Sequence, residues 1–149
     1  MSEVQVESTR GLQHSVTARG HQFVSDEPAG VGQDAGPTPY EYLLAALGAC
    51  TSMTLLMYAR RKGIPLESVR VRLRDQRVHA ADCADCESKE GHITEIARDI
   101  ELRGPLNTEQ RNRLLEIASK CPVHKTLTAE IKVRDRLVEK QNFRLKISD

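Results

Sequence analysis

The chain has 149 residues, enough for one domain with a single hydrophobic core. Its 22 lysines and arginines nearly balance its 21 aspartates and glutamates, and a net charge of +1 argues against sequence-independent binding of nucleic acid. Aromatic residues make up only 3 % of the chain and tryptophan is absent, so the core must rest on aliphatic side chains. Such a core favours sharing between subunits, and we expect an oligomer.

The first ten residues, MSEVQVESTR, carry an acidic residue at Glu3 and no following apolar run, which is not typical of a secretory signal. We therefore expect a cytoplasmic location. In a reducing compartment, the four cysteines are expected to be catalytic, metal-binding or inert.

Short alternating runs occupy the first 25 residues: VQVES, LQHSVTA and HQFVS, separated at Arg10-Gly11 and Arg19-Gly20. They predict a three-stranded antiparallel meander. The next segment, SDEPAGVGQDAGP, is rich in Gly, Pro and Asp and lacks apolar periodicity, so it predicts a loop.

A helix is predicted to begin at the tetrapeptide TPYE, residues 38–41, which supplies an N-cap, a first-turn proline and the glutamate of a capping box. It should run to about Lys62, with Gly63 as its stop. Residues 42–59 carry no charge for eighteen positions, long enough to consider a membrane span. Small and hydroxyl residues within this run favour a central buried helix instead, and we expect no membrane association.

Two long alternating segments follow, residues 66–79 and 92–103, and they predict the two strands of a hairpin. Asn107 or Thr108 should cap a helix through about Lys120, and Pro122 suits the first turn of another short helix. The final runs LTAEIKV, residues 127–133, and FRLKI, residues 143–147, predict further strands.

The loop of the predicted hairpin contains Cys83 and Cys86, flanked by His79 and His92. The pattern H-x3-C-x2-C-x5-H offers four ligands for zinc or another soft metal. A reversible disulfide is a second interpretation, and two solvent-facing thiols without a role are a third. Residue types and spacing leave all three open.

The other two cysteines lie on predicted helices. Cys50 lies about twelve residues into the long helix, too far from its N-terminus for the helix dipole to lower the thiol pKa strongly. Cys121 lies where one helix ends and the next begins, and His124 three residues later is able to polarise it or simply to face solvent. Taken alone, either cysteine is more typical of a structural residue than of a reactive one.

The segments GPTPYEYLLAALGACTSMTL and, about seventy residues later, ASKCPVHKTL resemble the OsmC/Ohr family, the osmotically induced and organic-hydroperoxide-resistance proteins. The likeness covers roughly Leu12 to Val133, and the order of elements matches as well. The resemblance implies an α+β fold in which an intertwined homodimer builds antiparallel sheets around a long central Cys-bearing helix. It implies a single OsmC-like domain over residues 1–149.

The resemblance also implies a thiol-dependent peroxidase. Cys50 would attack a small organic hydroperoxide and become a sulfenic acid, and Cys121 would convert this to a disulfide. A dithiol, a lipoyl group or similar, would reduce the disulfide, and no cofactor or metal is expected in this cycle. The alternative is a non-enzymatic OsmC-like dimer that binds an apolar ligand or partner.

An arginine and a glutamate activate the cysteine in that family, and Arg19 and Glu41 are the matching residues. A guanidinium from Arg19 would stabilise the Cys50 thiolate, although a solvated strand-end arginine has the same sequence signature. Glu41 precedes Cys50 by nine residues, which on a regular helix puts it on the opposite face and ~13 Å away along the axis. Glu41 therefore serves either the arginine, the site of the other subunit, or only the capping box.

Overall fold

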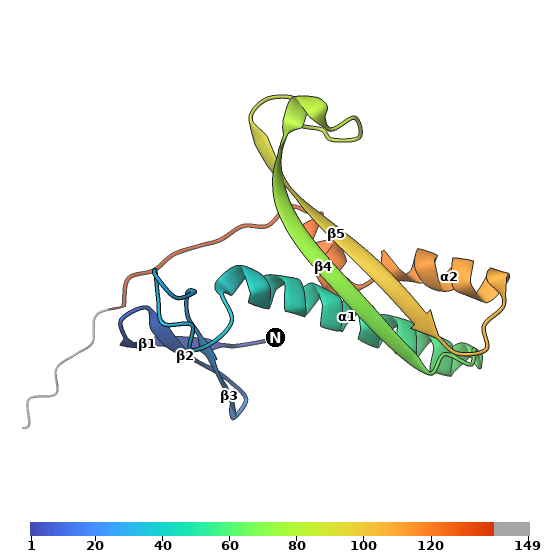
Figure 1. Cartoon of the computed structure of the whole chain (residues 1–149), viewed down its shortest axis with the longest axis horizontal. Helices are drawn as coiled ribbons and strands as arrows, with labels where there is room; N and C mark the ends of the chain where they lie inside the picture. Colours follow the sequence, from blue (N-terminus) through green and yellow to red (C-terminus); the bar gives the residue numbers. More distant parts are fainter. Residues whose placement is uncertain (139–149) are drawn as a thin grey trace, which may run out of the picture.

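The computed structural model describes residues 1–138 and contains two antiparallel sheets, one long helix and two shorter helices (Figure 1). The N-terminal sheet lies near the start of the long helix, and a long two-stranded hairpin crosses that helix and extends beyond it. In chain order the elements are β1 (Gln5–Arg10), β2 (Gln13–Ala18), β3 (His21–Ser25), α1 (Pro39–Lys62), β4 (Ser68–His79), the 3₁₀ turn η1 (Ala80–Asp82), β5 (His92–Arg103), α2 (Thr108–Ala118) and α3 (Pro122–Leu127).

The N-terminal meander is confirmed, with strand order β1-β2-β3 and antiparallel pairing throughout. It is joined to α1 by Tyr42, whose hydroxyl donates to the Val24 carbonyl at 2.5 Å and whose ring packs against Phe23. These contacts fix the first turns of α1 against the last strand of the meander.

Asp26 organises the loop between β3 and α1. Its carboxylate is almost fully buried and accepts hydrogen bonds from the backbone N–H groups of Glu27, Gln33 and Ala35. These donors, chiefly that of Glu27, lower the pKa of Asp26 despite its burial. The predicted loop is therefore an ordered turn around one buried carboxylate.

The predicted start and stop of α1 are both confirmed. The Glu41 N–H donates to Thr38 Oγ1 at 3.2 Å, and the Thr38 N–H donates to Glu41 Oε1 at 2.9 Å, which closes the capping box. Gly63 ends the helix in the left-handed conformation at φ 67°, and its N–H donates to the Ala59 carbonyl. By length and composition alone α1 is able to cross a membrane, a property that it shares with core helices of soluble proteins.

The hydrophobic core lies between α1, the hairpin and α2. Its fully buried members are Leu55 and Ala59 on α1 and Leu114, Ile117 and Ala118 on α2. They pack against the inward side chains of the hairpin, which alternate along β4 and β5 as the sequence predicted.

Gly48 allows α1 to approach the hairpin closely. A Cβ atom at this position would lie 2.7 Å from Leu73 Cδ1 on β4, so a larger residue would force the Leu73 side chain to move.

Two predicted strands need comment. The prediction of a strand at residues 127–133 is wrong. Leu127 ends α3, and the chain that follows is extended but pairs with no strand within residues 1–138. Alternating side chains make an amphipathic face, but a strand also requires a neighbouring strand for its backbone hydrogen bonds. The predicted strand at 143–147 lies outside the described residues. The α+β fold class is confirmed, and the homodimer stays a prediction.

Candidate functional site

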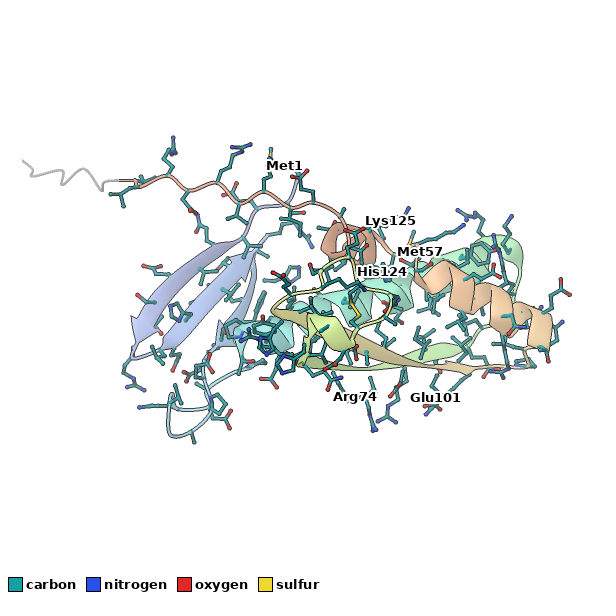
Figure 2. All side chains as sticks on the ribbon, turned by 90° about the horizontal axis from the view of Figure 1, so that it is seen from above. Met1, Met57, Arg74, Glu101, His124 and Lys125 are labelled. Atoms are coloured by element: carbon teal, nitrogen blue, oxygen red, sulfur yellow. A yellow bond between two sulfur atoms is a disulfide. The ribbon has the colours of Figure 1, made fainter. Side chains whose placement is uncertain are left out.

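The structure brings together the two free cysteines, Cys50 on α1 and Cys121 at the start of α3. Helix α3 packs against α1, and Figure 2 shows His124 of α3 close to the middle of the molecule. The Cys50 side chain is half-buried, whereas Cys121 is 0 % exposed. One thiol of the pair is therefore partly open to solvent, and the other is enclosed.

Local geometry explains the position of Cys121. Pro122 occupies the first position of α3, so Cys121 becomes the N-cap with extended backbone angles of φ −61° and ψ 133°. Its Sγ accepts a hydrogen bond from the His124 N–H at 3.3 Å, as a serine oxygen does at other N-caps. The cap thus directs the sulfur back toward α1.

The two thiols differ in acidity. Burial raises the pKa of the Cys50 thiol, and the neighbouring Cys121 raises it further. The Val123 N–H and the Thr54 hydroxyl oppose this rise but do not cancel it. Cys50 therefore keeps its proton more readily than a free cysteine does.

Burial also opposes ionisation of Cys121, but here the hydrogen-bond donors outweigh it. The pKa of Cys121 is lowered by the His124 N–H, by the Cys50 and Thr51 side chains and by the Val123 N–H. Of the two thiols, Cys121 therefore gives up its proton more readily, and Cys50 keeps its proton more readily.

Arg98 of β5 connects the elements that carry the pair. Its Nη1 donates to Thr51 Oγ1 at 2.9 Å and to the Ala118 carbonyl at 3.2 Å. Its Nη2 donates to His124 Nδ1 at 2.9 Å. One half-buried guanidinium therefore joins α1, the end of α2 and α3.

The bond from Arg98 also determines the state of His124. Burial, together with the Arg98 charge, lowers the pKa of His124. An Nδ1 atom that accepts from a guanidinium must be unprotonated, so the neutral ring carries its proton on Nε2. His124 is therefore a neutral partner of Arg98 at neutral pH.

Thr51 completes this network. It is 0 % exposed, and its hydroxyl donates to the Leu47 carbonyl at 2.7 Å while accepting from Arg98. Within the described residues, no buried side-chain polar atom is left without a hydrogen-bond partner. The polar groups around the cysteine pair are thus satisfied and fixed in place.

The structure places Arg19 and Glu41 elsewhere in the single chain. Arg19 lies exposed in the turn between β2 and β3, with φ at 50°, and Glu41 lies exposed in the capping box. The guanidinium that is bonded to the helices of the cysteine pair is that of Arg98. The activating roles of Arg19 and Glu41 stay predictions.

Sequence reasoning missed Arg98, although a signal was present. Along β5, Ile96, Arg98, Ile100 and Leu102 share one face because side chains alternate with a period of two. Arg98 pairs with Leu73 of the inward row on β4. A charged residue in an apolar row must have buried partners, and this requirement marks Arg98 as a residue of interest.

The remaining two cysteines, Cys83 and Cys86, are joined in a disulfide in the loop between β4 and β5, with Cα atoms 5.4 Å apart. The flanking His79 and His92 face each other as the last pair of the hairpin, with ring centroids 4.3 Å apart. Of the three interpretations left open by the spacing, the structure contains the disulfide.

Together these features define a class: an α+β chain in which a long helix crossed by a hairpin presents one cysteine to a second cysteine at a helix N-cap. The family model for OsmC-like protein matches residues 32–134, and the chain belongs to that family. No curated protein matches the sequence.

Solved structures of this family share the fold. An OsmC-like protein from Mycoplasma pneumoniae is 21 % identical, with a TM-score of 0.64 over 85 % of this chain and 86 % of that one. An organic hydroperoxide resistance protein OsmC from Legionella pneumophila is 18 % identical, with a TM-score of 0.62 over 86 % and 89 %. An organic hydroperoxide resistance protein from Elizabethkingia anophelis is 18 % identical, with a TM-score of 0.63 over 89 % and 91 %.

Proposed function

We propose that the chain is a thiol peroxidase that reduces organic hydroperoxides through a cycle of Cys50 and Cys121. The observation that carries this proposal is the contact between a half-buried thiol and a fully buried, more acidic cysteine. Membership of the OsmC-like family supports a peroxidase-like role, and two of the structural relatives are described as organic hydroperoxide resistance proteins.

The first half of the cycle needs a thiolate on the accessible sulfur. The Cys121 thiolate takes the proton of Cys50, and the Cys50 thiolate then attacks one oxygen of the O–O bond. That bond breaks, and the leaving alkoxide takes the proton from Cys121 to become the alcohol. Cys50 becomes a sulfenic acid, and Cys121 is again a thiolate. The apolar surroundings of α1 suit a hydroperoxide with an organic tail.

The second half forms the disulfide. The Cys121 thiolate attacks the sulfur of the Cys50 sulfenic acid, and hydroxide leaves and is protonated to water. One thiolate of an external dithiol, such as a lipoyl group, then attacks the disulfide, and its second thiol resolves the mixed disulfide. The two cysteines return to the thiol form and the donor becomes a disulfide.

The test uses the Cys83→Ser/Cys86→Ser background, so that only the Cys50 and Cys121 pair titrates. One equivalent of an alkyl hydroperoxide should remove both thiols, and peptide mapping should find Cys50 bonded to Cys121. Cys121→Ser, which lacks the base, should react more slowly than its parent and stop at a sulfenic acid that dimedone traps. Cys50→Ser should not react at the rate of its parent. A Cys50→Ser protein as fast as its parent would contradict the proposal.

We also propose that the chain works as a homodimer in the cytoplasm, where dithiol donors are available. Side chains of Met53 and Met57 on α1 are 61 % and 69 % exposed, which is unusual for a central helix. An apolar groove of about 650 Å³ between the N-terminal sheet and α1 is likewise open, and its lining includes Val6, Val16, Phe23, Tyr42 and Ala46. Sedimentation at micromolar concentration tests this proposal, and a stable monomer would contradict it.

A further inference from the structure

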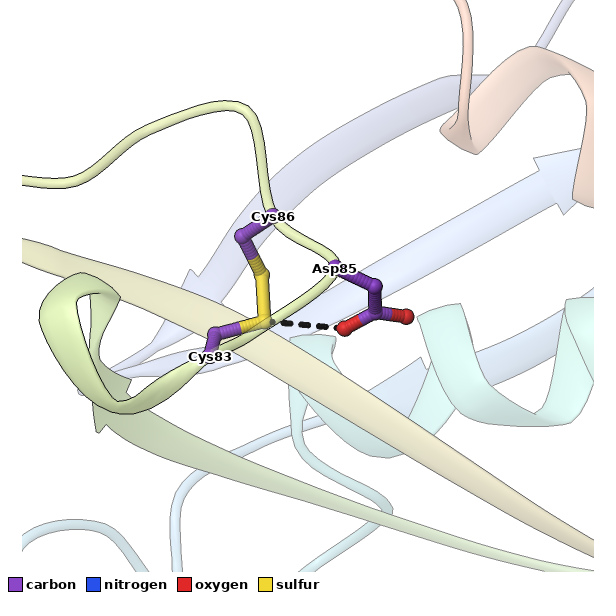
Figure 3. Close-up of side chains that lie close together, drawn as sticks. All are labelled: Cys83, Asp85 and Cys86. Carbon is purple, nitrogen blue, oxygen red and sulfur yellow. Dashed lines mark hydrogen bonds between the residues drawn. A yellow bond between two sulfur atoms is a disulfide. The ribbon is translucent and has the colours of Figure 1, made fainter.

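The hairpin tip, residues 80–91, carries a second redox pair that the cycle above does not use. Figure 1 shows the tip at the end of the hairpin, beyond the region where β4 and β5 cross α1. Figure 3 shows the Cys83–Cys86 disulfide there, with the Asp85 carboxylate beside it. We propose that this tip is a thiol–disulfide exchange site that accepts electrons from a dithiol and passes them to the Cys50–Cys121 disulfide of another chain. This inference rests on the proposed function.

The backbone holds the tip in a defined shape. Ala80 is fully buried and its N–H donates to the Gly91 carbonyl at 2.8 Å, just beyond the stacked histidines. The Cys83 N–H donates to the Ala80 carbonyl at 3.2 Å, and the Cys86 N–H donates to the Cys83 carbonyl at 3.4 Å. The two sulfurs are therefore held at bonding distance by a short turn, as a reversible dithiol requires.

Asp85 gives the two sulfurs different roles. Its Oδ1 lies 3.2 Å from Cys83 Sγ in the disulfide, near enough to accept a hydrogen bond from the thiol once Cys83 is reduced. Its negative charge repels an incoming thiolate from Cys83, so exchange begins at Cys86. The same carboxylate accepts the Cys83 proton when Cys83 has to attack in its turn.

Electrons enter in two steps. A thiolate of the external dithiol attacks Cys86 Sγ, the Cys83–Cys86 bond breaks, and Cys83 leaves and takes up a proton. The second thiol of the donor loses its proton and attacks the donor sulfur of the mixed disulfide, which releases Cys86. The donor has become a disulfide, and the tip has gained two electrons and two protons.

Electrons leave by the reverse chemistry. The Cys86 thiolate attacks Cys50, the more accessible sulfur of the oxidised pair, and Cys121 leaves and is protonated. Cys83 gives its proton to Asp85 and attacks Cys86, which releases Cys50. The tip is again a disulfide, and the cysteine pair is ready for another hydroperoxide.

The separation along the hairpin favours a receiving pair on another chain. Arg98, which is bonded to the Ala118 carbonyl and to His124 beside Cys121, lies six residues along β5 from His92 at the base of the tip. At about 3.3 Å per residue this separation is roughly 20 Å. Continuous pairing of β4 with β5 keeps the hairpin extended over this length, which separates the base of the tip from its own cysteine pair.

In this structure both sulfurs of the tip are in the bond between them, so neither is a thiolate that could bind a metal. Cys83, Asp85 and Cys86 do bring ligand atoms within 4.8 Å of one another, but this set provides three ligands, fewer than the four of a structural zinc site.

A hydroperoxide titration tests the relay. Fully reduced wild-type protein, freed of reductant, should consume two equivalents of alkyl hydroperoxide per chain and end with both disulfides. The Cys83→Ser/Cys86→Ser variant should consume one equivalent, at the same initial rate. A wild-type protein that consumes one equivalent and keeps Cys83 and Cys86 as thiols would overturn the relay and leave the proposed function intact. No consumption by either protein would overturn both.

Two variants sharpen the test. Asp85→Asn should slow the second equivalent by roughly tenfold or more while the first keeps its rate, and Asp82→Asn in the same loop is the matched control. Cys50→Ser with an intact tip should consume no hydroperoxide at the rate of the wild-type first equivalent. Consumption by that variant would show direct oxidation of the tip and would overturn the relay.

Transfer between chains is tested by co-expression. One chain carries Cys50→Ser/Cys121→Ser and the other carries Cys83→Ser/Cys86→Ser, so each retains a single pair. After reduction, the mixture should consume more than one equivalent per intact Cys50 pair. Consumption of only one equivalent would overturn transfer between chains.

Discussion

Replacing Arg98 with methionine removes the group that joins the three helices around the cysteine pair. The side chain keeps a similar length and its apolar stem, but the hydrogen bonds to Thr51 Oγ1, the Ala118 carbonyl and His124 Nδ1 are lost. The buried Thr51 oxygen and the half-buried His124 ring then lose a charged donor.

The magnitude follows from these contacts. A hydrogen bond to a charged group contributes about 1.5–3 kcal/mol, and bonds of one side chain are not additive. Because Arg98 is half-buried, water replaces part of what is lost. We expect the free energy of unfolding to fall by about 2–4 kcal/mol, which for a chain of this size lowers Tm by roughly 6–12 °C.

Two titrations separate this structural effect from an effect on the site. Loss of the Arg98 charge should raise the pKa of His124, which NMR of the ring protons measures. Loosening of α3 should weaken the bond from the His124 N–H to Cys121 Sγ and raise the pKa of Cys121, which thiol alkylation across pH measures. Because less Cys121 is then ionised, the rate at which the Cys50–Cys121 disulfide closes should fall.

Two control proteins define the comparison. Arg98→Lys keeps the positive charge but loses the forked guanidinium that makes several hydrogen bonds at once. It should therefore keep part of the lowering of the His124 pKa without restoring full stability. Arg72→Met changes an exposed arginine of the same hairpin and should alter the unfolding free energy by no more than about 0.5 kcal/mol. An Arg98→Met protein with unchanged Tm, alkylation profile and closure rate would refute the argument that this guanidinium positions the pair.

Further predictions concern four single residues. Thr51→Val removes the buried hydroxyl and should raise the pKa of Cys121 and lower stability by about 1–3 kcal/mol, measured by alkylation across pH and by denaturant unfolding. Asp26 has a lowered pKa in the folded chain, so its stabilising effect is present above pH about 4 and is lost as the pH falls further; Asp26→Asn should flatten this acid dependence in urea unfolding curves. Arg19→Ala should raise the pKa of Cys50 and slow peroxide reduction, whereas Glu41→Gln, which still closes a capping box, should change stability and rate only slightly. An unchanged Arg19→Ala profile beside a collapsed Glu41→Gln rate would reverse that assignment.

Local chemistry in the sequence was sufficient for most elements. The capping box at Thr38 and Glu41, the stop at Gly63 and the proline at the start of α3 depend only on residues a few positions apart, and all three are confirmed. The hairpin was equally predictable because apolar and polar residues alternate along both of its strands and one loop connects the two strands. The strand predicted at residues 127–133 was wrong because the prediction used local alternation alone. Alternation along one segment does not show whether a neighbouring strand is present to pair with it.

The pairing of Cys50 with Cys121 entered the sequence argument only through a family resemblance, because seventy residues separate them and no spacing rule spans that distance. The structure places Cys121 beside Cys50 by packing α3 on α1, and it joins Arg98 to the elements that carry the two cysteines. The sequence marks Arg98 as a charged residue in an apolar row, but it names neither the partners of Arg98 nor the neighbour of Cys50. The acidity of a thiol and the partner of a buried arginine depend on groups that folding brings together from distant segments, whereas caps, turns and alternation are encoded among near neighbours.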